Sequence, residues 1–229
     1  MRHAVTLVMD TSASPLRLGI EKEGRLFTLR KKGIKQEKLL FPALQKLLSR
    51  AEAQLADIKQ IFIIRGPGRF TGIRISLTFA SMLKYLNDAQ VKGATVFEVV
   101  AHQALHGGKF LRWKKANPTG VLAVVLHAFR EEYYLQLFDN DNQGPVWLSR
   151  EELLARLAAY PAPLWVAGSD KEFSSLESLL GKRYALAPAK DGRVQVQTLV
   201  KLNREEKFTQ DALEPLYLKP ARFELVKPV

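Results

Sequence analysis

Residues 61–76 read Ile61-Phe62-Ile63-Ile64-Arg65-Gly66-Pro67-Gly68-Arg69-Phe70-Thr71-Gly72-Ile73-Arg74-Ile75-Ser76, and this stretch decides the fold. Its first four residues are apolar without interruption, which predicts a strand buried on both faces. The apolar spacing after Gly72 predicts a helix that continues to Leu86. A strand followed by a helix is the connection that joins parallel strands, so the stretch predicts an α/β layer.

The residues before this stretch predict an antiparallel meander and a helix. Apolar or alternating runs at Val5–Met9, Leu16–Ile20 and Leu26–Leu29 are separated by short turns. Leucines and alanines at spacings of three and four between Leu40 and Leu55 then indicate an amphipathic helix.

The second half repeats this logic, and we expect it to use fewer strands. Before the second half begins, residues 91–97 predict a further strand and residues 99–105 a helix. In the second half, the predicted strands span residues 121–126, 133–138 and 164–167, and the predicted helices span 151–160, 171–180 and 196–204. Residues 106–120 are rich in Gly, Lys and Pro and indicate the junction between two domains. We therefore expect an N-terminal domain of residues 1–106 and a smaller C-terminal domain of residues 107–229.

The composition excludes several classes of protein and favours an anionic partner. The 229 residues contain 35 Lys and Arg against 23 Asp and Glu, a net charge of +12, and no Cys. A chain without Cys has no disulfides, thiolate zinc sites or Cys nucleophile. The basic excess is typical of proteins that bind nucleic acid, although ordinary globular proteins share it.

We expect the N-terminus to carry no export or membrane signal. The first apolar run, Ala4–Met9, ends at Asp10 after six residues. It is too short for a signal peptide, and far shorter than the roughly 20 apolar residues that span a bilayer. We expect a cytoplasmic protein with no membrane contact.

Two polar segments in the N-terminal half have both a functional and a structural interpretation. The Gly66–Gly72 loop before a helix could cradle a phosphate, with Arg65, Arg69 and Arg74 adding positive charge. It matches neither Gly-x4-Gly-Lys-Ser/Thr nor Gly-x-Gly-x-x-Gly, the two common phosphate-binding motifs. A structural turn that positions the helix against the sheet is therefore favoured. Asp10-Thr11-Ser12 could hold a magnesium phosphate, but from the three residues alone a side-chain-capped turn is favoured. We expect no cofactor.

The histidines do not form a convincing metal site. His102 and His106 lie four residues apart on one predicted helix face, but no third ligand has suitable spacing. We expect no metal and no catalytic residue.

An enzyme that binds nucleotide on its own would need a second phosphate-binding loop. Val166–Asp170, which contains one glycine, is the available candidate for that loop.

Two basic tracts are candidates for RNA contact. The first contains Lys31, Lys32 and Lys35, and the second is Arg112-Trp113-Lys114-Lys115. Basic residues beside an exposed aromatic ring could bind an RNA backbone and stack on a base. Solvated surface loops are the alternative interpretation.

These motifs together resemble a known family. Asp10-Thr11-Ser12 after the first strand, and Gly66 to Arg74 with the pattern Gly-Pro-Gly-x-Phe-Thr-Gly-x-Arg, resemble the hallmarks of the TsaB (YeaZ) family. The C-terminal segment Glu214–Pro220 resembles the family's ending. The resemblance spans the chain and is strong in residues 4–86.

The resemblance implies an actin-like, Hsp70-like ATPase (ASKHA) fold of two lobes, each a mixed sheet flanked by helices, with a reduced second lobe. It implies a non-catalytic subunit of bacterial tRNA threonylcarbamoyladenosine biosynthesis. Its expected partner is the catalytic TsaD, with the ATPase TsaE and tRNA reached through the complex. The alternative hypothesis is a nucleotide-binding ATPase or kinase that acts on its own. A third hypothesis is a protein that binds RNA directly.

The resemblance also implies a partner surface, on which a homodimer could form as well. It would lie on the helix after Gly72, and its expected residues are Arg69, Phe70, Thr71, Arg74, Leu77, Thr78, Ser81 and Met82. The sequence departs from the family where Gln36-Glu37-Lys38 replaces His-Ser-Glu and His127 replaces an Asp.

Overall fold

The computed structural model describes residues 4–33, 35–139, 143–170, 175–205, 208 and 213–219. The chain divides into two compact units. The first runs to Val99 and takes in Val194–Leu216, and the second comprises Val100–Arg193 and the residues from Tyr217. The domain boundary predicted from the sequence, between residues 106 and 107, places residues 194–216 in the second unit, and this placement needs correction. That segment instead returns to the first unit because its apolar residues pack on the first sheet.

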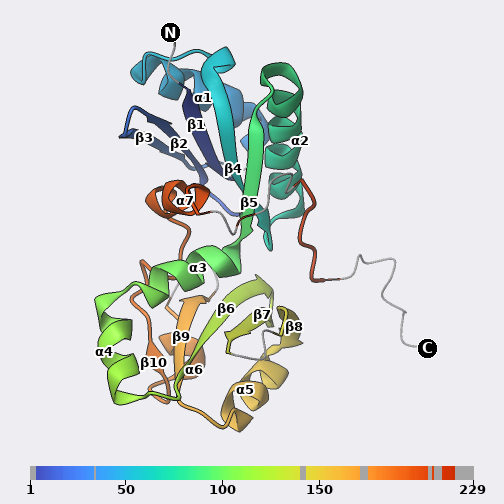
Figure 1. The fold of residues 1–229 in the computed structure, drawn as a ribbon. Coiled ribbons are helices and arrows are strands. Elements are labelled where there is room, and N and C mark those ends of the chain that lie inside the picture. Colours follow the sequence, from blue (N-terminus) through green and yellow to red (C-terminus); the bar gives the residue numbers. More distant parts are fainter. Residues whose placement is uncertain are drawn as a thin grey trace, which may run out of the picture. The chain divides into compact units, whose positions relative to one another are not determined.

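The first unit contains a five-stranded mixed sheet in the order β3-β2-β1-β4-β5 (Figure 1). Strands β1, β2 and β3 form the predicted antiparallel meander, and β1, β4 and β5 run parallel. The elements of this unit are β1 (Val5–Asp10), β2 (Leu16–Lys22), β3 (Arg25–Lys31), α1 (Gln36–Arg50), the 3₁₀ turn η1 (Leu55–Asp57), β4 (Ile58–Gly66), α2 (Phe70–Asn87), β5 (Gln90–Thr95) and α7 (Val196–Asn203).

The second unit contains another five-stranded mixed sheet, in the order β10-β9-β6-β7-β8. Strands β6, β7 and β8 form an antiparallel meander, and β9 pairs in parallel with both β6 and β10. Its elements are α4 (Gly108–Ala116), β6 (Val121–Phe129), β7 (Glu132–Phe138), β8 (Val146–Ser149), α5 (Arg150–Ala159), β9 (Leu164–Ser169), α6 (Glu177–Leu180) and β10 (Ala185–Leu186), while α3 (Val96–Leu105) contains the boundary between the units.

The two sheets have the same topology. In each, three consecutive strands form a meander, the first of them pairs in parallel with the strand that follows the next helix, and a fifth strand extends that parallel edge. The expected α/β architecture of two mixed sheets flanked by helices is confirmed. The expectation of fewer strands in the second lobe is wrong, since its described residues also form five. Strands β8 and β10 are only four and two residues long, so they carry too little periodic signal to be recognised in the sequence.

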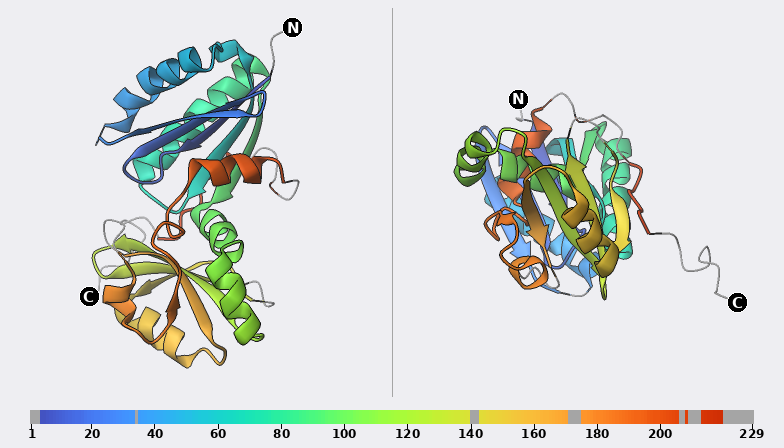
Figure 2. Two further views of the ribbon diagram at one scale, coloured as in Figure 1. Left: turned by 90° about the vertical axis from the view of Figure 1, so that its left-hand side faces the viewer. Right: turned by 90° about the horizontal axis from the view of Figure 1, so that it is seen from below.

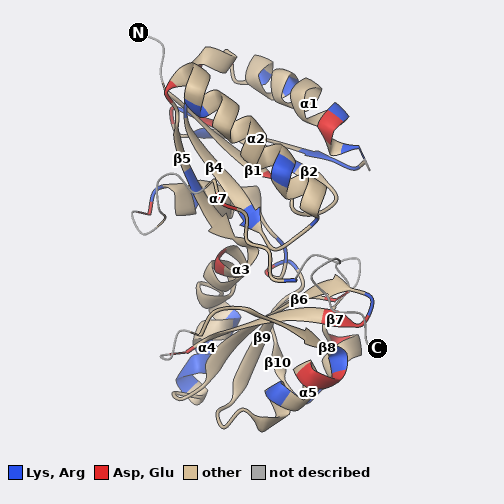
Figure 3. Cartoon of the chain, turned by 90° about the vertical axis from the view of Figure 1, so that its right-hand side faces the viewer, with Lys and Arg blue, Asp and Glu red and all other residues tan. Residues whose placement is uncertain are grey.

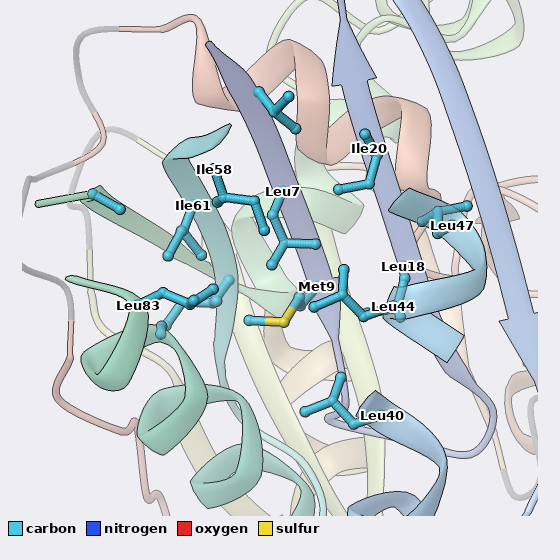
Figure 4. Packing of buried hydrophobic residues seen from close by; sticks show 14 of the residues in the cluster. Leu7, Met9, Leu18, Ile20, Leu40, Leu44, Leu47, Ile58, Ile61 and Leu83 are labelled. Carbon is cyan, nitrogen blue, oxygen red and sulfur yellow. The ribbon is translucent and has the colours of Figure 1, made fainter. Parts of the chain in front are cut away.

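Helices cover both faces of the first sheet. Leucines of α1 and residues of α2 pack with Leu7, Met9 and Ile61 on one face (Figure 4). Leu199 and neighbouring residues of α7 pack with Val8 and Phe62 on the other face. Figure 2 shows the orange-red ribbon of α7 beside the strands of the first sheet. Because adjacent residues of a strand point to opposite faces, the central strands must be apolar throughout, as the sequence shows.

The second sheet is also covered on both faces. Leu153 and Leu157 of α5, together with Leu179 of α6, pack against Val125 and Val166. On the opposite face, Phe110 and Trp113 of α4 contact the ring of Trp165, with centroids 5.9 and 5.5 Å apart. The aromatic residues of α4 therefore help to build this core.

Three sequence-based element assignments need correction. The predicted strand 91–97 ends at Thr95, because Thr95 and Glu98 form reciprocal capping hydrogen bonds that start α3. The predicted junction 106–120 contains the helix α4, whose ends are marked by Gly107 and Asn117. The predicted helix 171–180 is observed at Glu177–Leu180, and residues 171–174 lie outside the described residues.

Among the described residues, no helix is long and apolar enough to cross a membrane.

Replacing Leu199 by Ala should destabilise the first unit selectively. Leu199 is fully buried between α7 and the first sheet, so the cavity should cost about 2–5 kcal/mol. Hydrogen exchange followed by mass spectrometry should show faster exchange in β1 and β4 and unchanged exchange in β6 and β9. The exposed Lys201 on the same helix provides the control, since Lys201→Ala should leave both units unchanged. Equal loss of protection in both units would contradict the assignment of α7.

Candidate functional site

The carboxylate of Asp10 is buried and fully engaged at the end of β1. Its Oδ2 accepts a hydrogen bond from Nη1 of Arg17 at 2.6 Å, across the β1–β2 pair. Its Oδ1 accepts hydrogen bonds from the backbone N–H of Ser12 at 3.0 Å and from the Ser12 hydroxyl at 2.6 Å. Both oxygens therefore serve a buried ion pair and a capped turn, which supports the structural interpretation of this motif.

The Gly66–Gly72 loop packs directly on this turn. A Cβ atom at Gly68 would collide with the carbonyl oxygen of Ser12, and one at Gly72 would collide with that of Thr11. The N–H of Arg69 donates to the same Ser12 carbonyl at 2.7 Å. The glycines thus allow two backbone segments to touch. The space that a phosphate cradle would need on this side of the loop is filled by residues 11 and 12.

Two further segments pack against the contact between residues 10–12 and the Gly66–Gly72 loop. Gln36 at the start of α1 is buried and donates from Nε2 to the carbonyl of Ala13 at 2.7 Å. Leu216 donates from its N–H to the carbonyl of Arg65 at 2.8 Å, and a Cβ at Gly66 would lie 2.5 Å from the Leu216 carbonyl oxygen. The N-terminal motif, the glycine loop and part of the C-terminal segment therefore form one packed unit.

The three arginines at this loop have different environments. Nη1 of the half-buried Arg65 lies 3.3 Å from the carbonyl of Glu214, so this residue holds the C-terminal segment. Arg69 is exposed. The guanidinium of Arg74 lies 5.2 Å from the ring centre of Phe70, one helical turn away, and stacks as a cation–π pair on the surface of α2.

The candidate for a second phosphate loop is not a loop. Val166–Ser169 belong to β9, where they form a parallel ladder with residues 123–126 of β6. Oδ1 of the following Asp170 accepts a hydrogen bond from the hydroxyl of Tyr133 at 2.9 Å. Burial and this bond raise the pKa of Tyr133. The segment therefore serves the core of the second unit.

The histidines form a surface pair. The rings of His102 and His106 lie 4.2 Å apart, and Nδ1 of His106 lies 2.8 Å from the carbonyl oxygen of His102. Within the ranges that the structure describes, no group of three His, Cys, Asp or Glu residues is placed to hold a metal. His127 contacts the carbonyl of Arg130 with Nε2 at 2.8 Å, within the β6–β7 turn.

A groove of about 520 Å³ lies between α1 and α2. Its floor and walls are mostly apolar, and a carboxylate and a guanidinium lie among them. The lining residues are Glu37, Leu40, Phe70, Thr71, Arg74, Ile75, Thr78, Phe79 and Met82.

The groove continues into an exposed apolar stripe along α2. Phe70 is 55% exposed and Tyr85 is 89% exposed, and Met82 and Leu86 are also open to solvent. Phe41 adds a further exposed ring from α1. On α2, Thr71, Thr78, Met82, Tyr85 and Leu86 follow spacings of seven, four and three, so they share one face of the helix. Exposed apolar patches of this kind are typical of interaction surfaces.

Seven of the eight predicted partner-surface residues are exposed. These are Arg69, Phe70, Thr71, Arg74, Thr78, Ser81 and Met82. The placement of Leu77 on this surface is wrong, because it is only 8% exposed and belongs to the core of the first unit. Phe41, Tyr85 and Leu86 were missed. Because α2 is apolar around much of its circumference, its sequence does not separate the buried face from the exposed one.

The two basic tracts differ in accessibility. Lys31, Lys32 and Lys35 are exposed at the end of β3 and the turn after it. Arg112 and Lys115 are exposed on α4, whereas Nζ of Lys114 donates to the carbonyl of Gly120 at 2.6 Å. Trp113 is half-buried and its ring packs against Trp165, so this tract does not present a fully exposed aromatic ring.

Comparisons with known proteins find similarity to a TsaD family model and to relatives named TsaB. Residues 35–141 match the family model of "TsaD: tRNA N6-adenosine threonylcarbamoyltransferase". The chain is 25% identical over 138 residues to the "tRNA threonylcarbamoyladenosine biosynthesis protein TsaB" of Buchnera aphidicola subsp. Schizaphis graminum, covering 60% of this chain and 62% of that protein. It is 29% identical over 112 residues to the Escherichia coli protein of the same name, covering 49% and 44%. With the Bacillus subtilis protein of that name it shares 24% identity over 194 residues, covering 80% and 79%.

The matched region thus spans less than two thirds of the Buchnera and Escherichia coli relatives and about four fifths of the Bacillus relative. Among solved structures, "YeaZ from Pseudomonas aeruginosa" matches with a TM-score of 0.67 at 20% identity, covering 94% of this chain and all of that chain. This likeness shows the same fold.

Replacing Gly72 by Ala should destabilise the junction of the two motifs. The new methyl group would collide with a backbone carbonyl, which cannot rotate away, so we expect a loss of about 1–3 kcal/mol in the free energy of unfolding. Chemical denaturation followed by circular dichroism measures it. The matched control is Gly108→Ala, where no atom lies within 4 Å of the new Cβ. Similar stability of the two variants would argue against close packing at Gly72.

Proposed function

We propose that this chain, which belongs to the TsaB (YeaZ) family, takes part in the biosynthesis of threonylcarbamoyladenosine in tRNA. Within that process it acts as a non-catalytic subunit that binds and activates a TsaD-like catalytic partner. The observation that carries this proposal is the exposed apolar surface formed by the α1–α2 groove and the stripe on α2.

The chemistry of this surface suits a protein partner. Phe70 and Tyr85 offer large rings whose burial would remove much apolar area from water, and such aromatic anchors dominate the energy of protein interfaces. Glu37 and Arg74 lie among the groove residues, where each could pair with an opposite charge on the partner. The groove gives a partner side chain a concave place to insert.

The motifs that could have carried chemistry serve the fold instead, which supports a non-catalytic role. Both oxygens of Asp10 are engaged by Arg17 and Ser12. The glycine loop is filled on its inner side by residues 11 and 12. The segment that would supply a second phosphate loop lies in β9. The chemistry would then be supplied by the partner.

The same surface is also available to a second copy of the chain. When the catalytic partner is absent, pairing of two α2 stripes would cover the apolar residues, and the partner would compete with this homodimer. In the full complex, a TsaE-like ATPase and tRNA would be reached through the TsaD-like subunit. The cytoplasm is the location that this role requires.

Replacing Met82 by Asp should weaken both associations. Met82 lines the groove and is exposed, so the variant should fold normally while placing a charge in the centre of the apolar surface. We expect at least a 30-fold loss of affinity for the TsaD-like protein of the same organism, equivalent to about 2 kcal/mol or more. Isothermal titration measures this affinity, and analytical ultracentrifugation measures any homodimer.

The control is Gln197→Asp, which makes the same change of charge at an exposed position of α7, on the opposite face of the first sheet. This variant should bind as the unmodified chain does. Leu77→Glu is unsuitable, because a charge at that buried position would unfold the first unit. An unchanged affinity of the folded Met82→Asp variant would refute the proposed interface.

A further inference from the structure

A second cavity lies within the second unit and has aromatic walls. Its volume is about 300 Å³, and it is lined by Trp113 of α4, Tyr160 after α5, and Arg183 and Tyr184 before β10, among others. The three aromatic side chains are half-buried, and Arg183 is exposed. The volume is at the lower end of about 300–1,000 Å³ for small-molecule pockets, which suits one planar ring rather than a large ligand.

The aromatic walls are held in place from behind. The Trp113 ring packs on Phe110 and Trp165, with centroids 5.8 and 5.5 Å away. A Cβ at Gly120 would collide with the Trp113 ring, so this glycine lets the ring lie against the backbone. The Tyr160 hydroxyl donates to Oδ2 of Asp139 at 2.8 Å. Rings fixed in this way can receive a planar ligand with little loss of side-chain entropy.

The helix that supplies Trp113 is strongly basic. Residues 108–116 contain Lys109, Arg112, Lys114 and Lys115 and no acidic residue, and Figure 3 shows the blue of Lys and Arg on α4. Lys109, Arg112 and Lys115 are exposed at spacings of three, so they are neighbours on the surface of the helix. Arg183 adds a guanidinium on the cavity wall, 5.7 Å from the centre of the Tyr184 ring.

We propose that this cavity binds the base of an unpaired nucleotide of single-stranded RNA, and that Arg183 and the exposed cations of α4 contact the neighbouring phosphates. Aromatic rings beside a basic surface are the common means of binding single-stranded nucleic acid, since every base has a face that stacks and every linkage carries a negative charge. A protein partner would find a small cavity and repelling cations, which argues for a polyanion.

The inference goes beyond the proposed function and rests on it only in naming tRNA as the natural RNA. The cavity belongs to the second unit, whereas the partner groove belongs to the first. The two sites are tested with different ligands and different variants, so each can fail while the other stands.

The test uses the full chain and a fluorescently labelled single-stranded RNA of about ten nucleotides, within the usual site size. Fluorescence anisotropy gives the affinity, and a fully paired RNA duplex of the same length and free AMP serve as competitors. We expect the single strand to bind at least ten-fold more tightly than either competitor. Stacking should also quench tryptophan fluorescence, and Trp113→Phe should remove most of that quenching.

Variants separate stacking from charge. Tyr184→Ala should weaken binding about ten-fold, because the contribution of one stacked base is about 1–3 kcal/mol, whereas Tyr184→Phe keeps the ring and should bind normally. Arg112→Ala and Lys115→Ala should each lower the slope of log affinity against log salt by about 0.7. Lys46→Ala removes the same charge from an exposed position of α1 in the first unit and should leave the slope unchanged.

Thermal melting shows whether each variant is folded. If Tyr184→Ala is unstable, the exposed Arg183→Ala replaces it, with the expectation of weaker binding and a lower salt slope. Equal affinity for duplex and single strand would overturn the stacking role. If AMP bound as tightly as the single-stranded RNA, the cavity would be a site for free nucleotides and the proposal would be refuted. Unchanged binding by folded Tyr184→Ala and Arg183→Ala variants would place any RNA elsewhere on the chain.

Discussion

The close approach of two backbone segments, the turn at residues 10–12 and the glycine loop before α2, is the constraint on which the first unit depends. Gly68 and Gly72 lie against the carbonyls of Ser12 and Thr11, where no side chain fits. Because β1 and β4 are parallel neighbours, their ends meet at the same edge of the sheet. The contact sets where α2 begins, and therefore which of its residues face α1 and line the groove.

The same constraint explains why a motif that resembles a nucleotide site serves the fold here. The Asp10 carboxylate is buried, and it is stable there because Arg17 and Ser12 occupy both oxygens. A buried charge without such partners would be strongly destabilising. The polar residues at this edge thus hold a turn against a loop, and the features suited to binding lie elsewhere: an apolar groove in the first unit, and an aromatic cavity beside a basic helix in the second. Part of the net charge of +12 then has a specific place, on α4.

Most of the first unit could be predicted because its strands are long, uninterrupted and separated by recognisable turns. The strands and helices of the second unit are harder to predict from the sequence. Strand β10 has two residues, and α4 lies between glycines and an Asn-Pro pair that together resemble a linker. At the candidate sites, residue type alone was misleading in two cases. Leu77 looked like a surface residue of α2 and is buried, and Trp113 looked exposed and is half-buried against Trp165. Periodicity in a helix that is apolar on several sides leaves the direction of burial open.

By itself, the sequence determined the α/β fold class, the order of the meander and the α/β layer, and the resemblance to one family. These follow from hydrophobic periodicity and from a long local motif, both of which are properties of neighbouring residues. Only the tertiary structure decided which side of α2 is free, that residues 194–216 return to the first unit, and that Trp113, Tyr160 and Tyr184 share one cavity. Each of these depends on contacts between residues far apart in the chain, and no local pattern specifies which distant surfaces will pack together.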